Sequence, residues 1–585
     1  MRGSPVAQYR IRRTQRALLY ATLLAIAAFA PFFRLGEAPL MDVDESMYAQ
    51  IARNMVETGD WVTPRFKGEP AFLKPPLYYW AAAGSMSLLG PSEAAVRGVS
   101  GCFGLLTLLL TFLAGRALVD RDAGLLAALL LALSPGFVLM IRSSTVDMTL
   151  TLFMTAVLLG YVRTIRREPV DGRLVPDAAS FLMIWTGAAL ATLTKGPIGL
   201  LIPAAVLGLH ALATGRLRRL WGKWLAPGIL LYLAVVLTWY IACYRLHGYR
   251  FIESNLVLHN LRKFLEPGLY AHAPGGLFLI ENLLWMFFPW ILLLAAAFAS
   301  SLGGLLFKRG KATRLPEDGP LLLWLWILVP LIVFSISKYK LPTYMDPALP
   351  ACAILVASRL DQWIAGKGDT RGRTERITLA LGAGAAVLAA FAVLAGFFPH
   401  PSRAVRALPL LAILPAIGLS LLGATPGRRK VALAAACAAL LCLEAVLIGY
   451  AQPRISAYSP YREIGSMIHR DLGPGEGAFA FRTGTPGSLL FYAQRPVVYM
   501  EGYDQLYNVL HDRPGLLLIE SSEFDPLPET WRSRFEPIAA RPLFHVSKPT
   551  PEFLLPKTRD RAVSTLMLLR FEKGAVGEAA DSPAR

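Results

Sequence analysis

The chain has 585 residues, is 55% hydrophobic and carries a formal net charge of +19. A chain this long and this apolar is typical of an integral membrane protein and not of a soluble enzyme. Its basic residues fall in short clusters between apolar segments, which is the pattern of cytoplasmic membrane loops and argues against a nucleic-acid partner. The five cysteines lie in apolar segments without ligand spacing, so we expect neither a disulfide framework nor a cysteine metal site.

Thirteen apolar segments are long enough to cross a bilayer. Several arginines precede the first segment, which we interpret as an uncleaved span because it is longer than the apolar part of a signal peptide. The shorter apolar piece at 77–89 is assigned to the membrane interface, since counting it as a span would invert every later loop. The predicted spans are 17–34, 95–115, 122–141, 145–163, 179–194, 197–214, 225–243, 280–302, 319–337, 343–360, 376–397, 405–423 and 430–450.

The basic clusters fix the expected orientation. They lie in alternate loops, which places those loops and the amino terminus in the cytoplasm. The first outer loop, residues 41–94, and everything after residue 451 then face the periplasm of a bacterial cytoplasmic (inner) membrane. The lipid bilayer is therefore an expected partner of residues 1–451.

Residues 452–585 differ in character from the rest. Short apolar runs between Pro- and Gly-rich turns predict strands, and an amphipathic stretch predicts a helix. We expect a mainly α, polytopic membrane domain of about 13 transmembrane helices, followed by a small C-terminal periplasmic α/β domain in which no catalytic motif is found. The predicted strands are 477–481, 496–500, 515–519 and 565–571, and the helix is 461–469.

The first outer loop opens with acids. Asp42, Asp44 and Glu45 stand where an amphipathic, interfacial helix begins, with Tyr48 on its apolar face. A carboxylate in a first turn is favoured by the helix dipole, so a single acid would mean only capping. Three acids in four positions exceed what one cap needs. Later in the loop, two prolines hold Lys74 in an extended turn, where its ammonium either suits a lipid phosphate or extends to the head groups.

Further outer loops carry isolated charges. Asp147 enters the top of a span, where an acid is costly unless it is functional or paired, with Arg142 as the alternative partner. Lys195 stands on a tight outer turn. The loop at 244–282 holds His259 and His272, and two histidines at this spacing are weak evidence for a metal. No cofactor is therefore required, although a divalent ion stays open.

Together these loops resemble those of bacterial GT-C glycosyltransferases, including the aminoarabinose transferases that modify lipid A and, more distantly, the protein O-mannosyltransferases. The resemblance covers roughly residues 15–350. It is carried by the acidic helix start and by G-D-W at 59–61, G-E-P at 68–70, K-P-P-L-Y-Y-W at 74–80, T-K-G-P at 194–197 and S-K-Y-K-L-P-T-Y at 337–344.

The resemblance implies a set of site residues. Asp44 and Asp147 are the implied catalytic acids. Family members tend to read E-N-x-x-R-F in the loop where this chain has His259 and Lys263, so whether Arg262 or Lys263 meets a phosphate is open. Residues implied in donor phosphate or sugar binding are Lys74, Lys195, Arg262, Lys263, Lys340, Tyr344, Tyr48 and His272, with Glu45, Arg142 and His259 in support.

The implied reaction moves a sugar from a polyprenyl (undecaprenyl) phosphate carrier to lipid A or lipopolysaccharide at the periplasmic face. The sugar is 4-amino-4-deoxy-L-arabinose or another pentose or hexose, and transfer to a protein or another glycan is the alternative. Clustered cations neutralise the leaving phosphate in one inverting displacement. Asp44 then acts as base toward a hydroxyl, or positions an acceptor that is already an ionised phosphate.

The residues argue against two other functions. No D-x-D motif in a cytoplasmic loop and no Walker motif stands out, which favours a lipid-linked over a nucleotide donor. A transporter or flippase of lipid-linked sugars would place ionisable residues near the middle of the bilayer. The polar residues of this chain gather instead at span ends on one side.

Overall fold

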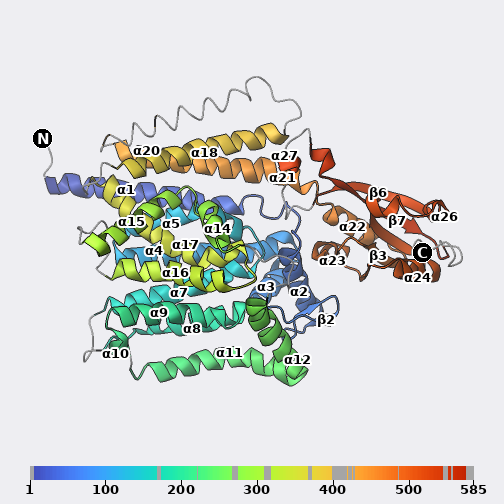
Figure 1. Cartoon of the computed structure of the whole chain (residues 1–585), viewed down its shortest axis with the longest axis horizontal. Helices are drawn as coiled ribbons and strands as arrows, with labels where there is room; N and C mark the ends of the chain where they lie inside the picture. The colour runs from blue at the N-terminus through green and yellow to red at the C-terminus, as the bar shows by residue number, and fades with distance from the viewer. Residues whose placement is uncertain are drawn as a thin grey trace.

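The structure is a computed structural model of the chain. It describes residues 5–574 apart from 168–172, 221, 267–274, 308–317, 367–371, 398–417, 419–424, 426–427, 485, 545–550 and 555–557. Long helices run roughly parallel in one bundle, and a sheet with its own helices stands at one end of it (Figure 1). Helix α1 begins at the end of the bundle that is farther from the sheet.

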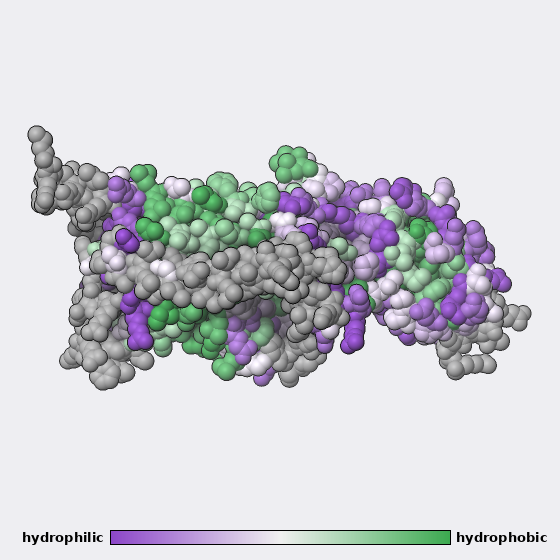
Figure 2. All heavy atoms as spheres, turned by 90° about the horizontal axis from the view of Figure 1, so that it is seen from above, coloured by the Kyte–Doolittle hydropathy of each residue, from purple (hydrophilic) through white to green (hydrophobic). Residues whose placement is uncertain are grey.

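The bundle supplies most of the structure. Its helices are α1 (Pro5–Phe29), α4 (Glu93–Leu118), α5 (Arg121–Ala132), α6 (Pro135–Ile141), α7 (Val146–Ile165), α8 (Ala178–Lys195), α9 (Ile198–Ala213), α10 (Leu217–Leu220), α11 (Leu225–His247), α14 (Phe278–Met286), α15 (Ile291–Phe307), α16 (Gly319–Ile336), α17 (Leu349–Ile364), α18 (Arg373–Phe397) and α20 (Arg429–Val446). Figure 2 shows hydrophobic residues over much of this part and more hydrophilic residues over the part that carries the sheet.

Shorter elements join the bundle to the sheet and connect its helices. They are η1 (Ala30–Phe32), α2 (Asp44–Thr58), β1 (Arg65–Phe66), β2 (Glu69–Pro70), α3 (Leu77–Leu89), α12 (Tyr249–Ile252), the π-helix η2 (Glu253–Arg262), α13 (Lys263–Leu265), η3 (Pro342–Ala348), the π-helix η5 (Leu447–Ala451) and α21 (Gln452–Ser456). Helices α2, α3 and α12 lie at the end of the bundle that faces the sheet (Figure 1).

The mainly helical, multi-pass character is confirmed, whereas the count of thirteen spans is not. Among the described residues, six helices are long and apolar enough to cross a membrane, or eight if each of two bent pairs is one span. Helices α8, α9, α17 and α18 also occupy predicted spans. The predicted span at 405–423 falls almost wholly outside the described residues.

Two spans predicted as continuous are broken. Helices α5 and α6 meet at 71°, and α14 and α15 meet at 118°. Pro135 stands at the start of α6 and Pro289 lies between α14 and α15. A proline cannot donate the backbone hydrogen bond that would carry a helix through and disfavours helical geometry in the residue before it, so each break follows from the sequence. Apolar length alone does not detect such a break.

Several helix boundaries follow ordinary capping chemistry. The side chains of Ser92, Asp120 and Asp177 accept hydrogen bonds from the first turns of α4, α5 and α8. Helix α2 carries Asp44 and Glu45 in its first turn and ends at Gly59, whose φ of +69° is favourable for glycine. These helix ends are therefore set by local sequence.

Residues 461–571 form a three-layered unit. The sheet order is β4-β3-β5-β7-β6, with β4, β3 and β5 parallel and the remaining pairs antiparallel. Side chains from α22 and α23 pack on one face, and those from α24 and α26 pack on the other. The strands and larger helices are α22 (Tyr461–Asp471), β3 (Gly477–Phe481), α23 (Gly487–Ala493), β4 (Val497–Met500), α24 (Tyr503–Asp512), β5 (Gly515–Glu520), β6 (Phe535–Leu543) and β7 (Ser564–Phe571), and the short turns are α25 (Ser521–Phe524), α26 (Glu529–Arg532), α27 (Pro551–Leu554) and η6 (Arg559–Arg561).

Candidate active site

Five charged residues, from four helices and the loop before α3, gather at the end of the bundle that carries α2. Asp44 of α2 interacts electrostatically with Lys74, Lys195 and Lys263 and with the carboxylate of Asp147. We call these five residues the acid–lysine cluster. Asp44 is exposed to solvent, Lys74 and Lys263 are partly exposed, and Asp147 and Lys195 are buried. The cluster therefore has a solvent-accessible side and a buried side.

The buried side of the cluster is an ion pair between Lys195 and Asp147. The ammonium of Lys195, at the end of α8, donates to Oδ1 of Asp147 in the first turn of α7. The same ammonium lies 4.6 Å from the ring centroid of Tyr344, which follows α16 by eight residues. Asp147 therefore pairs with Lys195, and the alternative Asp147–Arg142 pair is not formed.

The turn that places Lys195 depends on glycine. Gly196 has a φ of +79°, and a Cβ at that position would lie 2.9 Å from Oδ1 of Asn260. Asn260 belongs to the π-helix η2, the element that leads into Lys263. The close approach of the α8–α9 turn to η2 thus fixes the spacing between two of the three lysines.

Lys263 and Arg262 are adjacent but point in different directions. The ammonium of Lys263 lies 3.8 Å from the ring centroid of Tyr339 and interacts with Asp44 and Lys195. The Arg262 guanidinium is 48% exposed and pairs with Glu266 at 2.8 Å. Of the two residues whose roles the sequence left open, Lys263 is the one that joins the cluster.

The pKa values of Lys74, Asp44 and the neighbouring His259 are shifted. The surrounding protein, with Lys195 and Lys263, lowers the pKa of Lys74 to about 7. The surrounding protein and the neighbouring Asp147 raise the pKa of Asp44 above its usual value. Burial together with Lys74 and Lys263 lowers the pKa of His259 to about 4, so its imidazole is neutral at pH 7. An extra anion in the cluster would relieve the lysine repulsion.

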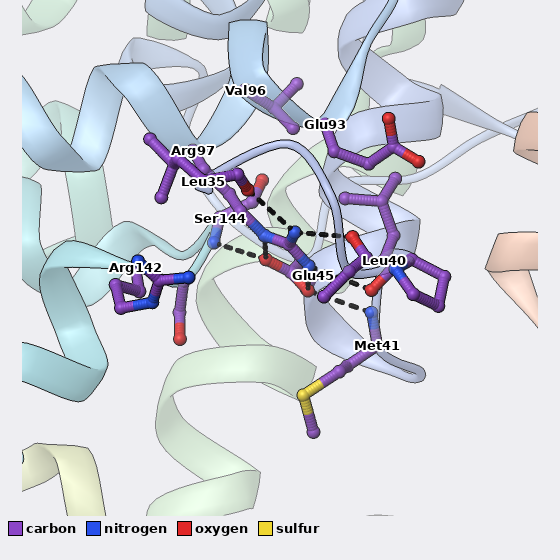
Figure 3. Close-up of polar contacts among 12 residues, drawn as sticks. Leu35, Leu40, Met41, Glu45, Glu93, Val96, Arg97, Arg142 and Ser144 are labelled. Carbon is purple, nitrogen blue, oxygen red and sulfur yellow. Dashed lines mark hydrogen bonds and ion pairs between the residues drawn. The ribbon is translucent and has the colours of Figure 1, made fainter. Parts of the chain in front are cut away.

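Glu45 stabilises the fold through an ion pair and hydrogen bonds to neighbouring elements. Its carboxylate accepts from Nε and Nη2 of Arg97 at 2.8 and 2.9 Å and from the backbone N–H groups of Met41 and Ser144 at 2.8 and 2.9 Å (Figure 3). Burial alone would raise the pKa of Glu45, but the Arg97 guanidinium and these hydrogen bonds hold that pKa below its usual value. Glu45 therefore ties the start of α2 to α4 and to the loop before α7.

The other supporting residues are placed as follows. Arg142 donates to the backbone oxygens of Pro31 and Phe33 and, at 2.7 Å, to Oε1 of Gln452. Tyr48 is buried, with its ring 5.6 Å from that of Tyr79. Lys340 is buried in the loop before η3. His272 lies outside the described residues, within which no group of three or more metal-ligating side chains is found.

A cavity of about 470 Å³ is lined by residues at the start of α2 and by none of the five residues of the acid–lysine cluster. Its wall is mostly apolar and includes Leu139, Trp285 and Leu447, with Arg142 and Gln452 among its polar members. Met41 and Asp42, which immediately precede α2, also line it. The start of α2 therefore contributes residues both to an amphipathic cavity and to the acid–lysine cluster.

Some contacts of the site were not predicted. Tyr339, beside Lys263, and Asn260, beside Gly196, occur within motifs of the sequence but were not assigned a role. Asp42 was grouped with the other acids of the helix start, whereas its carboxylate contacts Ser488 of α23. Adjacent acids on one turn point in different directions, and their spacing does not reveal which partner each will meet.

Comparison with known proteins adds independent findings. Residues 73–241 match the model of the family described as dolichyl-phosphate-mannose-protein mannosyltransferase. An uncharacterized protein of Aquifex aeolicus is 28% identical over 509 residues, which cover 85% of this chain and 90% of that protein. An undecaprenyl phosphate-alpha-4-amino-4-deoxy-L-arabinose arabinosyl transferase of Aeromonas hydrophila is 32% identical over 345 residues, 58% of this chain and 59% of that protein. The alignment thus spans less than two thirds of that transferase.

Similarity to a solved structure extends over nearly the whole chain. The crystal structure of ArnT from Cupriavidus metallidurans bound to undecaprenyl phosphate matches with a TM-score of 0.71 at 20% identity, covering 95% of this chain and 98% of that one. The two proteins share a fold. The chain is thus similar to the mannosyltransferase family over residues 73–241 and to an undecaprenyl-phosphate aminoarabinose transferase over 345 residues, and it shares the fold of ArnT over nearly its whole length.

Proposed function

We propose that the chain transfers a sugar from a polyprenyl-phosphate carrier to a lipid acceptor at the periplasmic face of the bacterial inner membrane. The observation that carries this proposal is the convergence of Lys74, Lys195 and Lys263 around Asp44 and Asp147. Three ammonium groups in a partly dehydrated cluster suit a phosphate, because charge-assisted hydrogen bonds gain strength where water is scarce.

The reaction follows from this charge distribution. An acceptor oxygen attacks the anomeric carbon of the sugar as the bond from that carbon to the carrier phosphate breaks. The departing phosphate takes the bonding electrons, and the lysines stabilise the negative charge that develops on it, so no general acid is required. Asp44 accepts the proton of an acceptor hydroxyl. Its carboxylate is solvent-accessible and has a raised pKa, and both features suit a base.

Asp147 has a different role in this proposal. Its carboxylate is buried and already accepts from Lys195, so it holds that ammonium and balances its charge. A single displacement by the acceptor then inverts the anomeric centre, because no second carboxylate acts as a covalent nucleophile. If the acceptor is an ionised phosphate, Asp44 orients it or stabilises positive charge on the sugar.

A lipid acceptor suits the amphipathic cavity beside the start of α2. The apolar wall around Leu139 and Trp285 fits an acyl chain, and the guanidinium of Arg142 fits a head-group phosphate. The name of the Aeromonas hydrophila relative favours 4-amino-4-deoxy-L-arabinose as the sugar. The resemblance of the loop motifs to the transferases that modify lipid A favours lipid A as the acceptor. The match to the mannosyltransferase model keeps a protein acceptor as the second candidate.

The test is a transfer assay with purified protein. Radiolabelled polyprenyl-phosphate aminoarabinose and polyprenyl-phosphate mannose are each incubated with lipid A, with an unfolded protein and with no acceptor. We expect label from the aminoarabinose donor on lipid A, with equimolar release of carrier phosphate. Label on the protein would show that the acceptor is a protein and not a lipid. Movement of intact donor across a proteoliposome membrane without product would contradict sugar transfer altogether.

A further inference from the structure

The unit formed by residues 461–571 lies against the start of α2, where it contacts the residues on both sides of Asp44. Oδ1 of Asp42 accepts from the backbone N–H of Ser488 at 3.0 Å and from Oγ of Ser46 at 2.5 Å. The hydroxyl of Ser488, which is fully buried, donates to Oδ2 of Asp42. Asp42 and Ser46 thus flank Asp44 in the sequence, and both belong to one hydrogen-bonded group with Ser488.

Close packing supports this contact. Helix α23 approaches α2 at Gly487, where a Cβ would lie 2.8 Å from Oγ of Ser46 and 3.0 Å from the backbone nitrogen of Met47. A side chain at this position would force Ser46 or the neighbouring backbone to shift, so the contact favours glycine. Further along α23, Phe491 is buried in the same apolar cluster as Tyr48 of α2.

Further hydrogen bonds join the two parts on either side of the contact. Nη1 of Arg53, near the end of α2, donates to the backbone oxygen of Phe491 at 2.7 Å. The hydroxyl of Tyr492 accepts from the backbone N–H of Leu40 at 2.8 Å and donates to Glu93 at 2.7 Å. The segment that carries Asp44 is therefore attached to α23 before and after that residue.

The Arg97–Glu45 pair holds this segment from the other side. Glu45 bonds to α4 and the loop before α7, whereas Asp42 bonds to α23. Asp44 itself bonds to neither element among the contacts of the described residues and faces the lysines. Its position is set by two neighbours that are anchored in opposite directions, one in the bundle and one in the sheet unit.

We infer that Asp42 and Ser488 are positioning residues, through which the C-terminal sheet unit fixes the turn that presents Asp44 to the acceptor. The inference rests on the proposed role of Asp44 in sugar transfer. Displacement of a catalytic group by about 1 Å can cost on the order of 100-fold in rate, so a contact two residues away is close enough to matter. The lysines stand on other elements and do not depend on this contact.

The test separates turnover from donor binding. We expect Asp42→Ala and Ser488→Ala each to lower kcat by on the order of tenfold, with the Kd for undecaprenyl phosphate changed less than about twofold. Since the two side chains act through each other, the double variant should fall about as far as either single variant and not 100-fold. Asp42→Asn retains an acceptor oxygen for the Ser488 N–H and should lose less than Asp42→Ala.

Ser466→Ala is the matched control, because Ser466 is an exposed serine of α22 in the same unit. Hydrogen exchange provides a readout independent of turnover. We expect the backbone amides of residues 43–47 to exchange faster in Ser488→Ala than in Ser466→Ala. Gly487→Ala, which keeps both polar partners, should show the same acceleration because its Cβ displaces α23.

Two results would overturn the inference. One is an unchanged kcat in Asp42→Ala and Ser488→Ala, and the other is unchanged exchange at residues 43–47 in both variants. Full turnover by Asp44→Asn would instead contradict the proposed role of Asp44 as base. Hydrogen exchange at residues 43–47 would still test the contact between Asp42 and Ser488. Failure of the inference and failure of the proposed function are therefore distinguishable.

Discussion

At the scale of single residues, the neighbouring Arg262 and Lys263 offer a direct test of the donor site. Lys263 belongs to the acid–lysine cluster, whereas the exposed Arg262 is paired with Glu266. We expect Lys263→Ala to raise the Kd for undecaprenyl phosphate about tenfold, since a charge-assisted hydrogen bond contributes roughly 1.5–3 kcal/mol. Arg262→Ala should change that Kd less than about twofold. An equal loss in the two variants would show that Lys263 is not a specific ligand.

The titration of Lys74 predicts a pH dependence of donor binding. Its pKa is about 7 in the free protein, chiefly because of the surrounding protein and secondly because of Lys195 and Lys263. A bound phosphate favours the charged ammonium and raises that pKa. Above pH 7, binding therefore requires uptake of a proton, and the Kd should rise by up to about tenfold per pH unit between pH 7 and 9.

Lys74→Arg is the control for this dependence. Arginine stays protonated throughout the pH range, so the rise in Kd should flatten if the guanidinium reaches the phosphate. Binding would be measured with a short-chain polyprenyl phosphate at constant ionic strength. A steep rise that persists in Lys74→Arg would assign the titration to another group.

At the scale of elements, the turn between α8 and α9 should be sensitive to a single methyl group. Gly196 has a φ of +79°, and a Cβ there would lie 2.9 Å from Asn260. We expect Gly196→Ala to destabilise the protein by about 1–3 kcal/mol through backbone strain and to weaken donor binding by moving Lys195.

Gly208→Ala on α9 is the matched substitution, because a Cβ there meets nothing within 4 Å. It should be neutral or slightly stabilising, since alanine is the better helix former by about 1 kcal/mol. Thermal unfolding in detergent and undecaprenyl phosphate binding would be measured for both variants. Similar stability of the two proteins would contradict the strain assigned to Gly196.

The elements also show what local sequence can predict. Helix α2 lies where the helical pattern placed it, and strands β3, β4, β5 and β7 lie where short apolar runs placed them. Strand β6 was missed because Pro537 and Pro542 interrupt its pattern, and it is tolerated as an edge strand with an irregular register at Pro537. The bends at Pro135 and Pro289 were missed because apolar length was given more weight than the prolines.

The site was predictable to the extent that its residues occur in short motifs. Asp44, Lys74, Asp147 and Lys195 come together because each stands at an outer helix end or turn, and charge clusters reveal which ends share a side. The contact between Asp42 and Ser488 spans 446 residues. Neither residue carries a local signal for the other, so only the folded chain shows how α23 meets α2.

At the scale of the whole molecule, the proposal requires the first outer loop and the C-terminal sheet unit to share one side of the membrane. Helix α10 lies at the other end of the bundle (Figure 1). In a variant without the native cysteines, we expect an impermeant maleimide to label Glu69→Cys and Arg470→Cys in cells with a permeable outer membrane. Arg218→Cys of α10 should be labelled only after the inner membrane is opened.

All three positions are exposed, so differences in labelling report the side of the membrane and not burial. Labelling of positions 69 and 470 from opposite sides would separate the sheet unit from Asp44 and exclude the shared site. Labelling of position 218 in intact cells would reverse the proposed orientation while keeping the site assembled.

The central claim is that Asp44 acts on an acceptor beside a lysine-bound carrier phosphate. Its most direct test is the turnover of Asp44→Asn with polyprenyl-phosphate aminoarabinose and lipid A, compared with Glu69→Gln, an exposed acid of the same loop. We predict that Asp44→Asn loses at least about 100-fold in kcat and still binds undecaprenyl phosphate, whereas Glu69→Gln keeps normal turnover. Normal turnover by Asp44→Asn at equal protein concentration would contradict the account.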